Sequence, residues 1–508
     1  MSLVGEVLFP YQVEAAERIA EQKKLLLADQ PGLGKTLEVF GGLELAGLLD
    51  KPSAILIATP IVNAQTTWVD TIERFVRKYH DVVLVDVSKG SAAQKAKAFL
   101  VGVRESVDTG LPTIFLANHN ALDWVKTQHR VAGLAEVRFD AVVVDESHMV
   151  LPIRVGGGLT NFWRGLLRIK MPDGCLRVAV SGTPDRGKLE NRFGTWRFLF
   201  PDFVGSDLWA WLAEWFFIVD QRVSKSRVVK SVAGLRKEAA WLVNDELRML
   251  RRTKAEVLPE LPPKRYVDVE VELCKAQMAN YFKAQLVYEE QLRGGDESGA
   301  MTFALRSRQL ATCSWDDGWT PVVGGVSAKR DWLVEWLSER GFVEFDAMSD
   351  ADAKVVIVSQ FSKVLFWLQA ELRLLGVECA VLDGSASAAK RAAIQDEFQN
   401  GKLRVVLLSG SMGVGINLDK ADDLIMLDVP YDPDRVEQIE DRVHRASSNH
   451  HVTIWNVAAV DTIDQVVLEQ VSKRYKVTRG LLDGSRGVDF ARKVLAIVRK
   501  GSGEVAAE

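Results

Sequence analysis

The stretch LLLADQPGLGKTLEV, residues 25–39, combines residue types that suit a phosphate group. Gly32 and Gly34 allow backbone N–H groups to curl around an anion, and the helix expected to follow adds partial positive charge at its N-terminus. Lys35 could neutralise phosphate charge, and Thr36 could offer a hydroxyl to Mg²⁺. The stretch therefore predicts a nucleotide-binding loop.

One position breaks the usual spacing G-x-x-x-x-G-K-[ST], because Asp29 stands where the first glycine belongs. On this loop alone, a glycine-rich helix cap with an incidental lysine is the alternative. The stretch FDAVVVDESHMV, residues 139–150, argues against it, because an apolar strand there delivers Asp145 and Glu146. Asp145 could hold Mg²⁺, and Glu146 could polarise the water that attacks a phosphate.

A third candidate group lies in DPDRVEQIEDRVHRAS, residues 432–447. On a helix, residues at i, i+3, i+4 and i+7 share one face, and here these are Gln438, Asp441, Arg442 and Arg445. The arginines could serve as fingers that grip the γ-phosphate across a cleft, since guanidinium stays charged and binds oxygens bidentately. The alternative is a surface helix whose arginines pair with neighbouring carboxylates.

The elements that would position these residues are short apolar runs alternating with helical patterns. In the first half the runs are residues 24–30, 54–60, 81–87, 113–119, 141–147 and 177–183, and in the second half 354–360, 378–384, 404–410, 423–429 and 452–458. Runs of this kind are typical of parallel strands buried on both faces. Helices are expected between them, for example over residues 67–79 and 91–103. The chain therefore predicts an α/β fold with two parallel-sheet lobes.

The 508 residues are too many for one core, and the pattern divides them into four parts. The expected domains are lobe one (1–185), a helical insertion and connector (186–264), lobe two (265–475) and a C-terminal helical tail (476–508). The insertion is rich in Trp, Arg and Leu and shows no strand series. The proline-stiffened stretch LPELPPK, residues 258–264, is the candidate boundary between the lobes.

Bulk composition narrows the class of protein. Hydrophobic residues make up 47% and charged residues 26%, as in ordinary globular domains, and the net charge of −4 requires any nucleic-acid surface to be local. No apolar run reaches the roughly 18 residues that cross a bilayer, and the N-terminus lacks a secretory pattern. The four cysteines form no C-x-x-C pair, which argues against disulfides and a zinc site. A reducing compartment is expected.

Together these motifs resemble helicase superfamily two and, within it, the Swi/Snf-type ATPases, over nearly the whole chain. LFPYQVEAAERI resembles the adenine-recognition segment, and DQPGLGKT resembles D-E-M-G-L-G-K-T, in which aspartate is the normal occupant of position 29. KLENRFGTWRFLFPDFVG and LRMLRRTKAEVLPELPPK resemble two blocks that DEAD-box RNA helicases lack. Gln30 and Pro31 depart from the family's Glu-Met.

The resemblance implies two tandem RecA-like lobes and assigns roles residue by residue. The implied catalytic residues are Lys35, Glu146, Arg442 and Arg445. The implied nucleotide contacts are Gln12 as adenine reader, Asp29, Gly32, Leu33, Gly34, Lys35, Thr36, Gly415 and Gln438. Thr36 and Asp145 would hold Mg²⁺. Ser181 and Thr183 would couple the nucleotide state to movement of the lobes.

Family members track along DNA through its phosphates, and the resemblance nominates contacts for this. They are Thr59, Pro60, Asn118, His119, Ser359, Gln360, Gly384, Ser385 and Ser409. Such contacts carry no sequence information, so binding should be sequence-independent and weaken with salt. Arg251 and Arg252 could also touch phosphate, or could instead brace the seam between the lobes.

The resemblance implies an ATP-dependent DNA translocase or helicase in the cytoplasm of a bacterial or virus-infected bacterial cell. It would use ATP and Mg²⁺ on duplex or branched DNA as a monomer, in repair, recombination or replication-fork remodelling, with no membrane and with any recruiting protein unidentified. One alternative is a strand-separating helicase of the same superfamily. The other is a nucleotide-gated DNA-binding module with little turnover.

Overall fold

The computed structural model describes residues 2–123, 130–153, 159–185, 188–224, 227–243, 245–293, 299–343, 352–410, 416–445, 448 and 450–478. The chain divides into two compact units, residues 1–259 and residues 260–508. The division falls inside the proline-containing stretch 258–264 that the sequence marks as a boundary.

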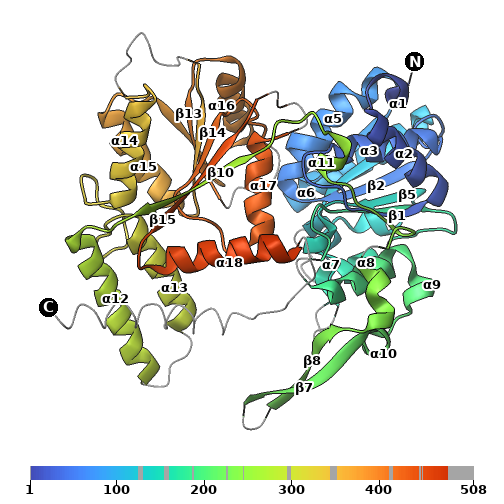
Figure 1. Ribbon diagram of the computed structural model, residues 1–508. Helices are drawn as coiled ribbons and strands as arrows, with labels where there is room; N and C mark the ends of the chain where they lie inside the picture. Colours follow the sequence, from blue (N-terminus) through green and yellow to red (C-terminus); the bar gives the residue numbers. More distant parts are fainter. Residues whose placement is uncertain are drawn as a thin grey trace. The chain divides into compact units, whose positions relative to one another are not determined.

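The first unit is built on a parallel sheet of seven strands in the order β3-β4-β2-β5-β6-β1-β9 (Figure 1). The strands are β1 (Lys24–Leu27), β2 (Ala54–Thr59), β3 (Val83–Val87), β4 (Thr113–Asn118), β5 (Ala141–Val144), β6 (Leu176–Val180) and β9 (Met249–Leu250). Because all pairs are parallel, the loops after β1, β2, β5 and β6 leave the same edge of the sheet. That edge carries the residues predicted to bind nucleotide.

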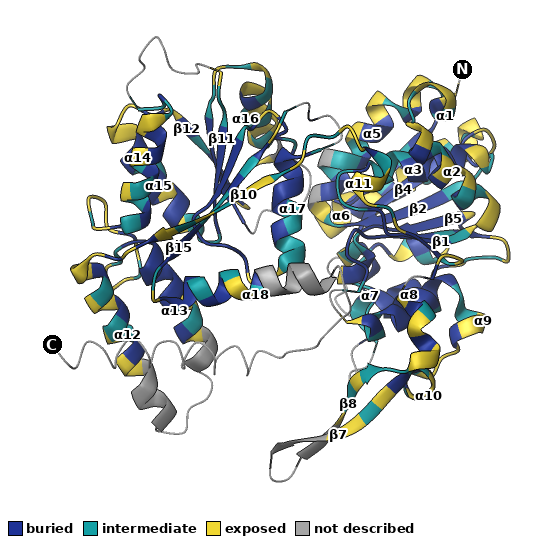
Figure 2. Ribbon diagram, viewed as in Figure 1, coloured by how far each residue is buried: buried dark blue, intermediate teal, exposed yellow. Residues whose placement is uncertain are grey.

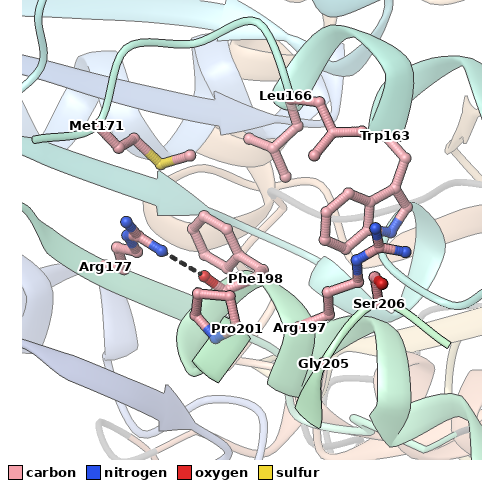
Figure 3. Close-up of a pocket in the computed structure, with 10 residues that line it drawn as sticks. Trp163, Leu166, Met171, Arg177, Arg197, Phe198, Pro201, Gly205 and Ser206 are labelled. Carbon is pink, nitrogen blue, oxygen red and sulfur yellow. Dashed lines mark hydrogen bonds between the residues drawn. The ribbon is translucent and has the colours of Figure 1, made fainter. Parts of the chain in front are cut away.

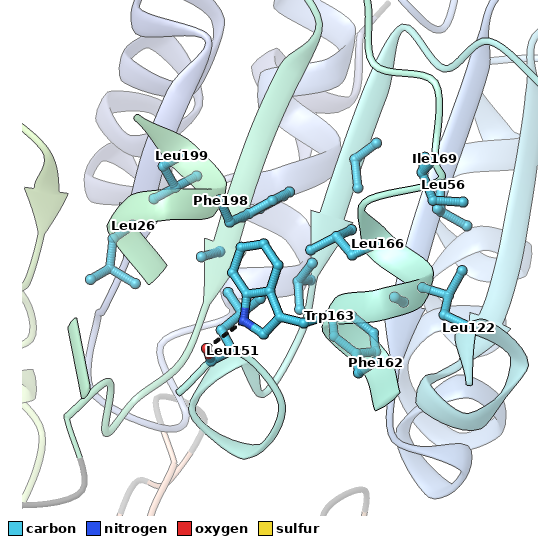
Figure 4. Packing of buried hydrophobic residues seen from close by; sticks show 14 of the residues in the cluster. Leu26, Leu56, Leu122, Leu151, Phe162, Trp163, Leu166, Ile169, Phe198 and Leu199 are labelled. Atoms are coloured by element: carbon cyan, nitrogen blue, oxygen red, sulfur yellow. Dashed lines mark hydrogen bonds between the residues drawn. The ribbon is translucent and has the colours of Figure 1, made fainter. Parts of the chain in front are cut away.

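The strands of this sheet carry apolar residues on both faces, and helices cover both faces (Figure 2). One face packs against α1 (Leu3–Glu6), α2 (Pro10–Gln22), α3 (Lys35–Leu45) and α5 (Val69–Arg74). The other packs against α6 (Ala92–Thr109), α7 (Asn161–Leu166) and α8 (Arg192–Leu199). On this second face the Trp163 indole donates to the Leu151 carbonyl at 2.7 Å within a dense apolar cluster (Figure 4).

The close packing of α2 on α3 fixes the start of α3, and with it the candidate phosphate loop. Gly41 and Gly42 lie at the contact, where an added Cβ would come within 2.9 Å of Ala16 and 2.5 Å of Ile19 respectively. Since neither helix could move away without opening the core, only glycine allows this approach.

The sequence predicts a helical segment over residues 186–264, but the structure is helical in only part of it. Besides α8, it contains α9 (Pro201–Val204), α10 (Leu208–Trp215) and α11 (Lys254–Val257), but also an antiparallel hairpin, β7 (Phe216–Ser224) with β8 (Arg227–Leu235). The prediction missed the hairpin because its β-branched residues are interspersed with charged ones. It also missed β9, whose two residues belong to the first sheet through pairing with β1.

The second unit is built on a parallel sheet of six strands in the order β10-β15-β14-β11-β13-β12. The strands are β10 (Arg265–Val271), β11 (Val355–Ser359), β12 (Cys379–Leu382), β13 (Val405–Ser409), β14 (Asp423–Met426) and β15 (Thr453–Ala459). One face packs against α16 (Ala388–Asn400), α17 (Pro433–Val443) and α18 (Ile463–Thr478). The other packs against α12 (Lys275–Arg293), α14 (Ala328–Glu339) and α15 (Ser362–Leu374), and α13 (Gly299–Thr312) contributes to both.

The predicted class, α/β with two tandem RecA-like lobes, is confirmed, and all eleven predicted apolar runs contain strands. The helix expected over residues 67–79 is broken into a π-helical turn at 64–68, α5 and a 3₁₀ turn at 76–78. The helix expected over 91–103 runs further, to Thr109. Within the described ranges, no helix is both long and apolar enough to cross a bilayer.

Candidate nucleotide site

The candidate phosphate loop, residues 28–34, joins the end of β1 to the first turn of α3. Gly32 and Gly34 both have positive φ, 87° and 86°. A Cβ on Gly34 would also lie 2.3 Å from the amide nitrogen of Gln12, so both conformation and space require glycine there. The loop therefore presents its backbone to the start of a helix, as an anion site requires.

Side chains of α2 hold the loop from beneath. The Gln12 amide donates to the Leu33 carbonyl at 2.8 Å, the Tyr11 hydroxyl donates to the same carbonyl at 2.9 Å, and the Gln12 amide oxygen accepts from the Phe9 N–H at 3.0 Å. Gln12 is only 3% exposed. In this structure its side chain braces the loop, and its assignment as adenine reader stays a prediction.

The two polar residues at the start of α3 are not buried. The Lys35 ammonium donates to two carbonyls of its own loop, Asp29 at 2.7 Å and Gln30 at 3.3 Å. Thr36 follows it in the first turn and is partly exposed. Both lie where phosphate oxygens would meet the helix N-terminus.

Asp29, the residue that breaks the usual loop spacing, is fully buried and forms an ion pair with Arg252. Its carboxylate accepts from the Arg252 backbone N–H at 2.8 Å and from two guanidinium nitrogens at 3.0 and 2.5 Å. The same guanidinium reaches Glu38 at 3.3 Å and Glu14 at 3.2 Å. Burial, together with the Asp29 charge, raises the pKa of Glu38 well above its usual value, and Arg252 opposes that rise.

The segment around Arg252 runs beside the loop as an extension of β9. The Ala28 N–H donates to the Leu250 carbonyl at 2.7 Å, and the Gln30 N–H donates to the Arg252 carbonyl at 2.9 Å. The Gln30 side chain accepts from the Lys254 N–H at 2.8 Å. Gln30, one of the two departures from the family pattern, therefore fastens the loop to this segment.

Pro31, the other departure, lies against Gly182, where an added Cβ would be 2.6 Å from the proline ring. The Arg251 guanidinium donates to the Gly182 carbonyl at 3.1 Å. Arg251 and Arg252 thus brace the loop within the first unit, a role that the two alternatives considered from the sequence did not include.

Asp145 follows β5, and its carboxylate is held by four donors. One oxygen accepts from the Thr59 hydroxyl at 2.7 Å, the Asn63 amide at 3.0 Å and the Trp68 indole at 3.0 Å. The other accepts from the Glu146 N–H at 2.9 Å. A carboxylate held by four donors is fixed in orientation, which suits a metal or water ligand.

Glu146 has the left-handed backbone conformation, with φ 45° and ψ 45°, which is uncommon for a residue with a side chain. Its carboxylate lies 3.2 Å from Nδ1 of His148, which in turn lies 2.8 Å from the Ser181 hydroxyl. That hydroxyl accepts from the Thr183 N–H at 3.1 Å. The loops after β5 and β6 are thereby joined, and the two predicted coupling residues belong to this network.

Three of the predicted DNA contacts are fully buried in this structure, namely Thr59, Ser359 and Ser409. Their assignment as phosphate contacts stays a prediction. Thr59 donates to Asp145, and Ser359 donates to the buried Asp428 at 2.6 Å, because a hydroxyl at a strand end lies close to the neighbouring strand's carboxylate.

The remaining predicted DNA contacts differ in exposure. Asn118 caps the turn at residues 119–122 by accepting from the Ala121 N–H at 2.8 Å. Nε2 of His119 lies 3.0 Å from the Asp145 carbonyl, and burial lowers the pKa of His119, so the ring is neutral and donates. Gly384 and Ser385 are exposed after β12, and Pro60 and Gln360 are partly exposed. These last four stay predictions.

The two predicted arginine fingers lie in the second unit. The expected shared helix face is wrong, because α17 ends at Val443 and His444 is extended, which places Arg445 beyond the helix. The two guanidiniums nevertheless converge, since both donate to the Ile416 carbonyl, Arg442 at 3.4 Å and Arg445 at 2.8 Å. Burial lowers the pKa of Arg445.

The acidic residues of α17 pair with a lysine outside the helix. Lys264 pairs with Glu440 at 2.9 Å and Asp441 at 3.4 Å, so these carboxylates have a partner outside the helix. The two acidic residues raise the pKa of Lys264 against the effect of burial. Gln438 is partly exposed on α17, and Gly415 lies outside the described residues.

We predict that Asp29→Asn and Arg252→Gln each lower the free energy of unfolding by about 3–5 kcal/mol, because each leaves a buried charge without its partner. The double variant should lose less than the sum of the two by more than about 1 kcal/mol, as groups in direct contact do. Urea unfolding checks both values.

The matched control is Arg77→Gln, which removes a guanidinium paired to Glu73 at 2.8 Å on a half-exposed helix surface. Its cost should stay under about 0.5 kcal/mol. Additive losses for the Asp29 and Arg252 variants would show that the pair does not hold the loop.

Comparison with known proteins places the chain in a family. A profile for the SNF2-related domain matches residues 11–314, and one for the helicase conserved C-terminal domain matches residues 329–447. An uncharacterised ATP-dependent helicase of Mycoplasma pneumoniae is 26% identical over 93% of this chain and 42% of its own length. The ISWI chromatin-remodelling complex ATPase ISW1 of Saccharomyces cerevisiae is 21% identical over 99% of this chain and 44% of its own length.

Among solved structures, the Sulfolobus solfataricus SWI2/SNF2 ATPase core in complex with double-stranded DNA aligns with a TM-score of 0.38 at 19% identity, covering 93% of each chain. This chain spans less than half the length of the two relatives above. The SNF2-related profile alone covers more than half of this chain, from the loop-bracing helix α2 to α13. The chain belongs to the SNF2-related family.

Proposed function

We propose that this chain hydrolyses ATP to ADP and phosphate and uses the energy to move along duplex or branched DNA. The observation that supports it most is the convergence of three loops at one sheet edge. The phosphate loop follows β1, Asp145 and Glu146 follow β5, and Ser181 follows β6, and these three strands are neighbours. An open parallel sheet binds ligands at this edge.

In this proposal, Lys35 and the first-turn N–H groups of α3 bind the β- and γ-phosphates. Glu146 orients and polarises the attacking water, and its carboxylate lies 3.2 Å from Nδ1 of His148. Arg442 and Arg445, from the second unit, stabilise the charge that develops on the γ-phosphate. Hydrolysis would then depend on both units.

The donor set fits Mg²⁺, which prefers oxygen ligands and retains several waters. The Asp145 oxygen that receives only the Glu146 N–H keeps acceptor capacity, while the other is fixed by three donors. Thr36 supplies a hydroxyl on the first turn of α3. These two residues would hold the ion, which would neutralise phosphate charge.

The proposed substrate is DNA. The relatives are named ATP-dependent helicase and chromatin-remodelling ATPase, which points to nucleic acid. Gly384 and Ser385 are exposed after β12, where the Ser385 N–H and hydroxyl donate to the Asp383 carboxylate at 3.1 and 2.7 Å. A DNA phosphate could replace that carboxylate as their acceptor. Repair, recombination or replication-fork work is the proposed setting.

We predict that Glu146→Gln lowers the rate of phosphate release by about 100-fold or more, because the amide cannot accept the proton of the attacking water. ATP binding, measured with a fluorescent analogue, should persist, and duplex DNA should stimulate the wild-type protein only. The control is Glu136→Gln, a carboxylate 80% exposed that pairs with Lys170. If the wild-type protein and Glu146→Gln released phosphate at equal rates, with and without DNA, the nucleotide-gated binding module would be favoured.

We predict that Arg442→Lys and Arg445→Lys each lower kcat by about 10²–10³-fold with little change in nucleotide affinity, because lysine keeps the charge and loses the bidentate fork. Single-turnover phosphate release measures this. The control, Arg435→Lys, lies on α17 together with Arg442 and should keep wild-type turnover. Wild-type rates in both finger variants would remove the second unit from the reaction.

We predict DNA-stimulated ATP hydrolysis without strand separation, as expected of a translocase. A fluorescent strand-displacement assay on forked duplex DNA checks this. Displacement that depends on ATP would instead assign the chain to the strand-separating helicases.

A further inference from the structure

A second candidate site lies in the first unit, away from the sheet edge that carries the phosphate loop. It is a cavity of about 380 Å³ between α7, the start of β6 and the end of α8. Arg177, which lines it, is near the beginning of β6, whereas Ser181 follows the end of that strand. The volume is in the range of ligand and side-chain pockets. We call it the Trp163–Arg197 cavity.

The walls of this cavity are largely apolar. Trp163 and Leu166 come from α7, Phe198 comes from α8, and Met171 comes from the segment between α7 and β6 (Figure 3). Leu167 also lines the cavity and is 55% exposed, so apolar surface continues from the interior onto the rim.

Two guanidinium groups provide the only formal charge among the described residues that line the cavity. Arg177 donates to the Phe198 carbonyl at 3.1 Å, which fixes its position (Figure 3). The Arg197 guanidinium lies 5.7 Å from the centre of the Trp163 ring. No carboxylate among these residues neutralises either group, so the cavity favours an anionic occupant.

The chemistry of the walls narrows the choice of anion. A guanidinium binds a carboxylate through two parallel hydrogen bonds, and apolar walls favour an aromatic or aliphatic group beside it. A nucleotide would bring a polar sugar and base, whose hydrogen-bonding groups these walls would leave unpaired.

The rim favours a peptide over a free small molecule. A small carboxylate that filled the cavity would leave Leu167 in water, whereas the residues flanking a bound side chain would cover it. Aromatic side chains that insert into such pockets are frequent anchors of protein interfaces.

We propose that the Trp163–Arg197 cavity binds a segment of a partner protein in which an aromatic or aliphatic side chain stands beside an Asp or Glu. The apolar side chain enters the cavity, and the carboxylate pairs with Arg197. The proposal does not depend on ATP hydrolysis, so each can fail without the other.

The test uses the full 508-residue chain and fluorescein-labelled hexapeptides that pair Asp or Glu with Phe, Trp, Leu or Met, each with its Asn or Gln counterpart. Fluorescence anisotropy should show at least one acidic peptide binding about fivefold or more tighter than its neutral counterpart. Arg197→Gln should abolish that difference.

A matched pair of rim variants separates charge from packing. Leu167→Glu should weaken the acidic peptide about fivefold or more, and Leu167→Lys should not, because the two substitutions differ mainly in the sign of the charge. An unchanged thermal midpoint verifies that each variant is folded, as an exposed position allows.

Three results would overturn the proposal. One is the absence of binding by every acidic peptide, and another is equal affinity for the acidic and neutral peptides. The third is displacement of the bound peptide by 3-phenylpropionate at lower concentration than by unlabelled peptide, which would assign the cavity to a free small carboxylate.

Discussion

The buried ion pair between Asp29 and Arg252 is the constraint on which the candidate nucleotide site depends. Its partners are separated by more than two hundred residues, yet the carboxylate accepts hydrogen bonds from both the backbone N–H and the guanidinium of the arginine. Backbone hydrogen bonds of Ala28 and Gln30 run beside it. The candidate phosphate loop and the segment that leads into α11 therefore form one structural element, although the loop follows the first strand of the sheet along the chain and the segment follows the last.

A second constraint joins Asp145 and Glu146, the residues proposed for hydrolysis, to their neighbours. Asp145 is oriented from β2 and the helices beyond it, whereas the Glu146 carboxylate lies 3.2 Å from His148, which contacts Ser181 in the loop after β6. The strained backbone at Glu146 turns the two adjacent carboxylates into these different environments. Two residues that are consecutive in sequence can thus serve as metal ligand and as base.

The sequence predicted the fold well where a strand is apolar on both faces, because such runs differ from everything around them. It missed β10 and β9, which are outermost strands of their sheets. β10 alternates apolar and polar residues, and β9 is too short to form a pattern. The hairpin β7–β8 was missed because its charged residues resemble those of a helix surface.

The candidate site was predictable to the extent that local motifs define it. Lys35, Asp145 and Glu146 follow strands and could be found from order alone. The partner of Asp29 could not, since no spacing rule relates residues so far apart. The helix face proposed for Arg445 failed because one extended residue, His444, ends the helix. The burial of Thr59 and Ser359 could not be predicted, because the sequence does not show which carboxylate accepts a hydrogen bond from each hydroxyl.

The contacts of Lys35 in this structure have a consequence for ligand discrimination. Its ammonium already has two carbonyl oxygens from its own loop, at 2.7 and 3.3 Å. Two of its three N–H donors are thus engaged with the loop, and a single anion can meet the third. A chain of linked phosphates could also engage the amides of the glycine turn, so a loop of this kind would distinguish a polyphosphate from a lone inorganic anion by the number of donors that each can reach.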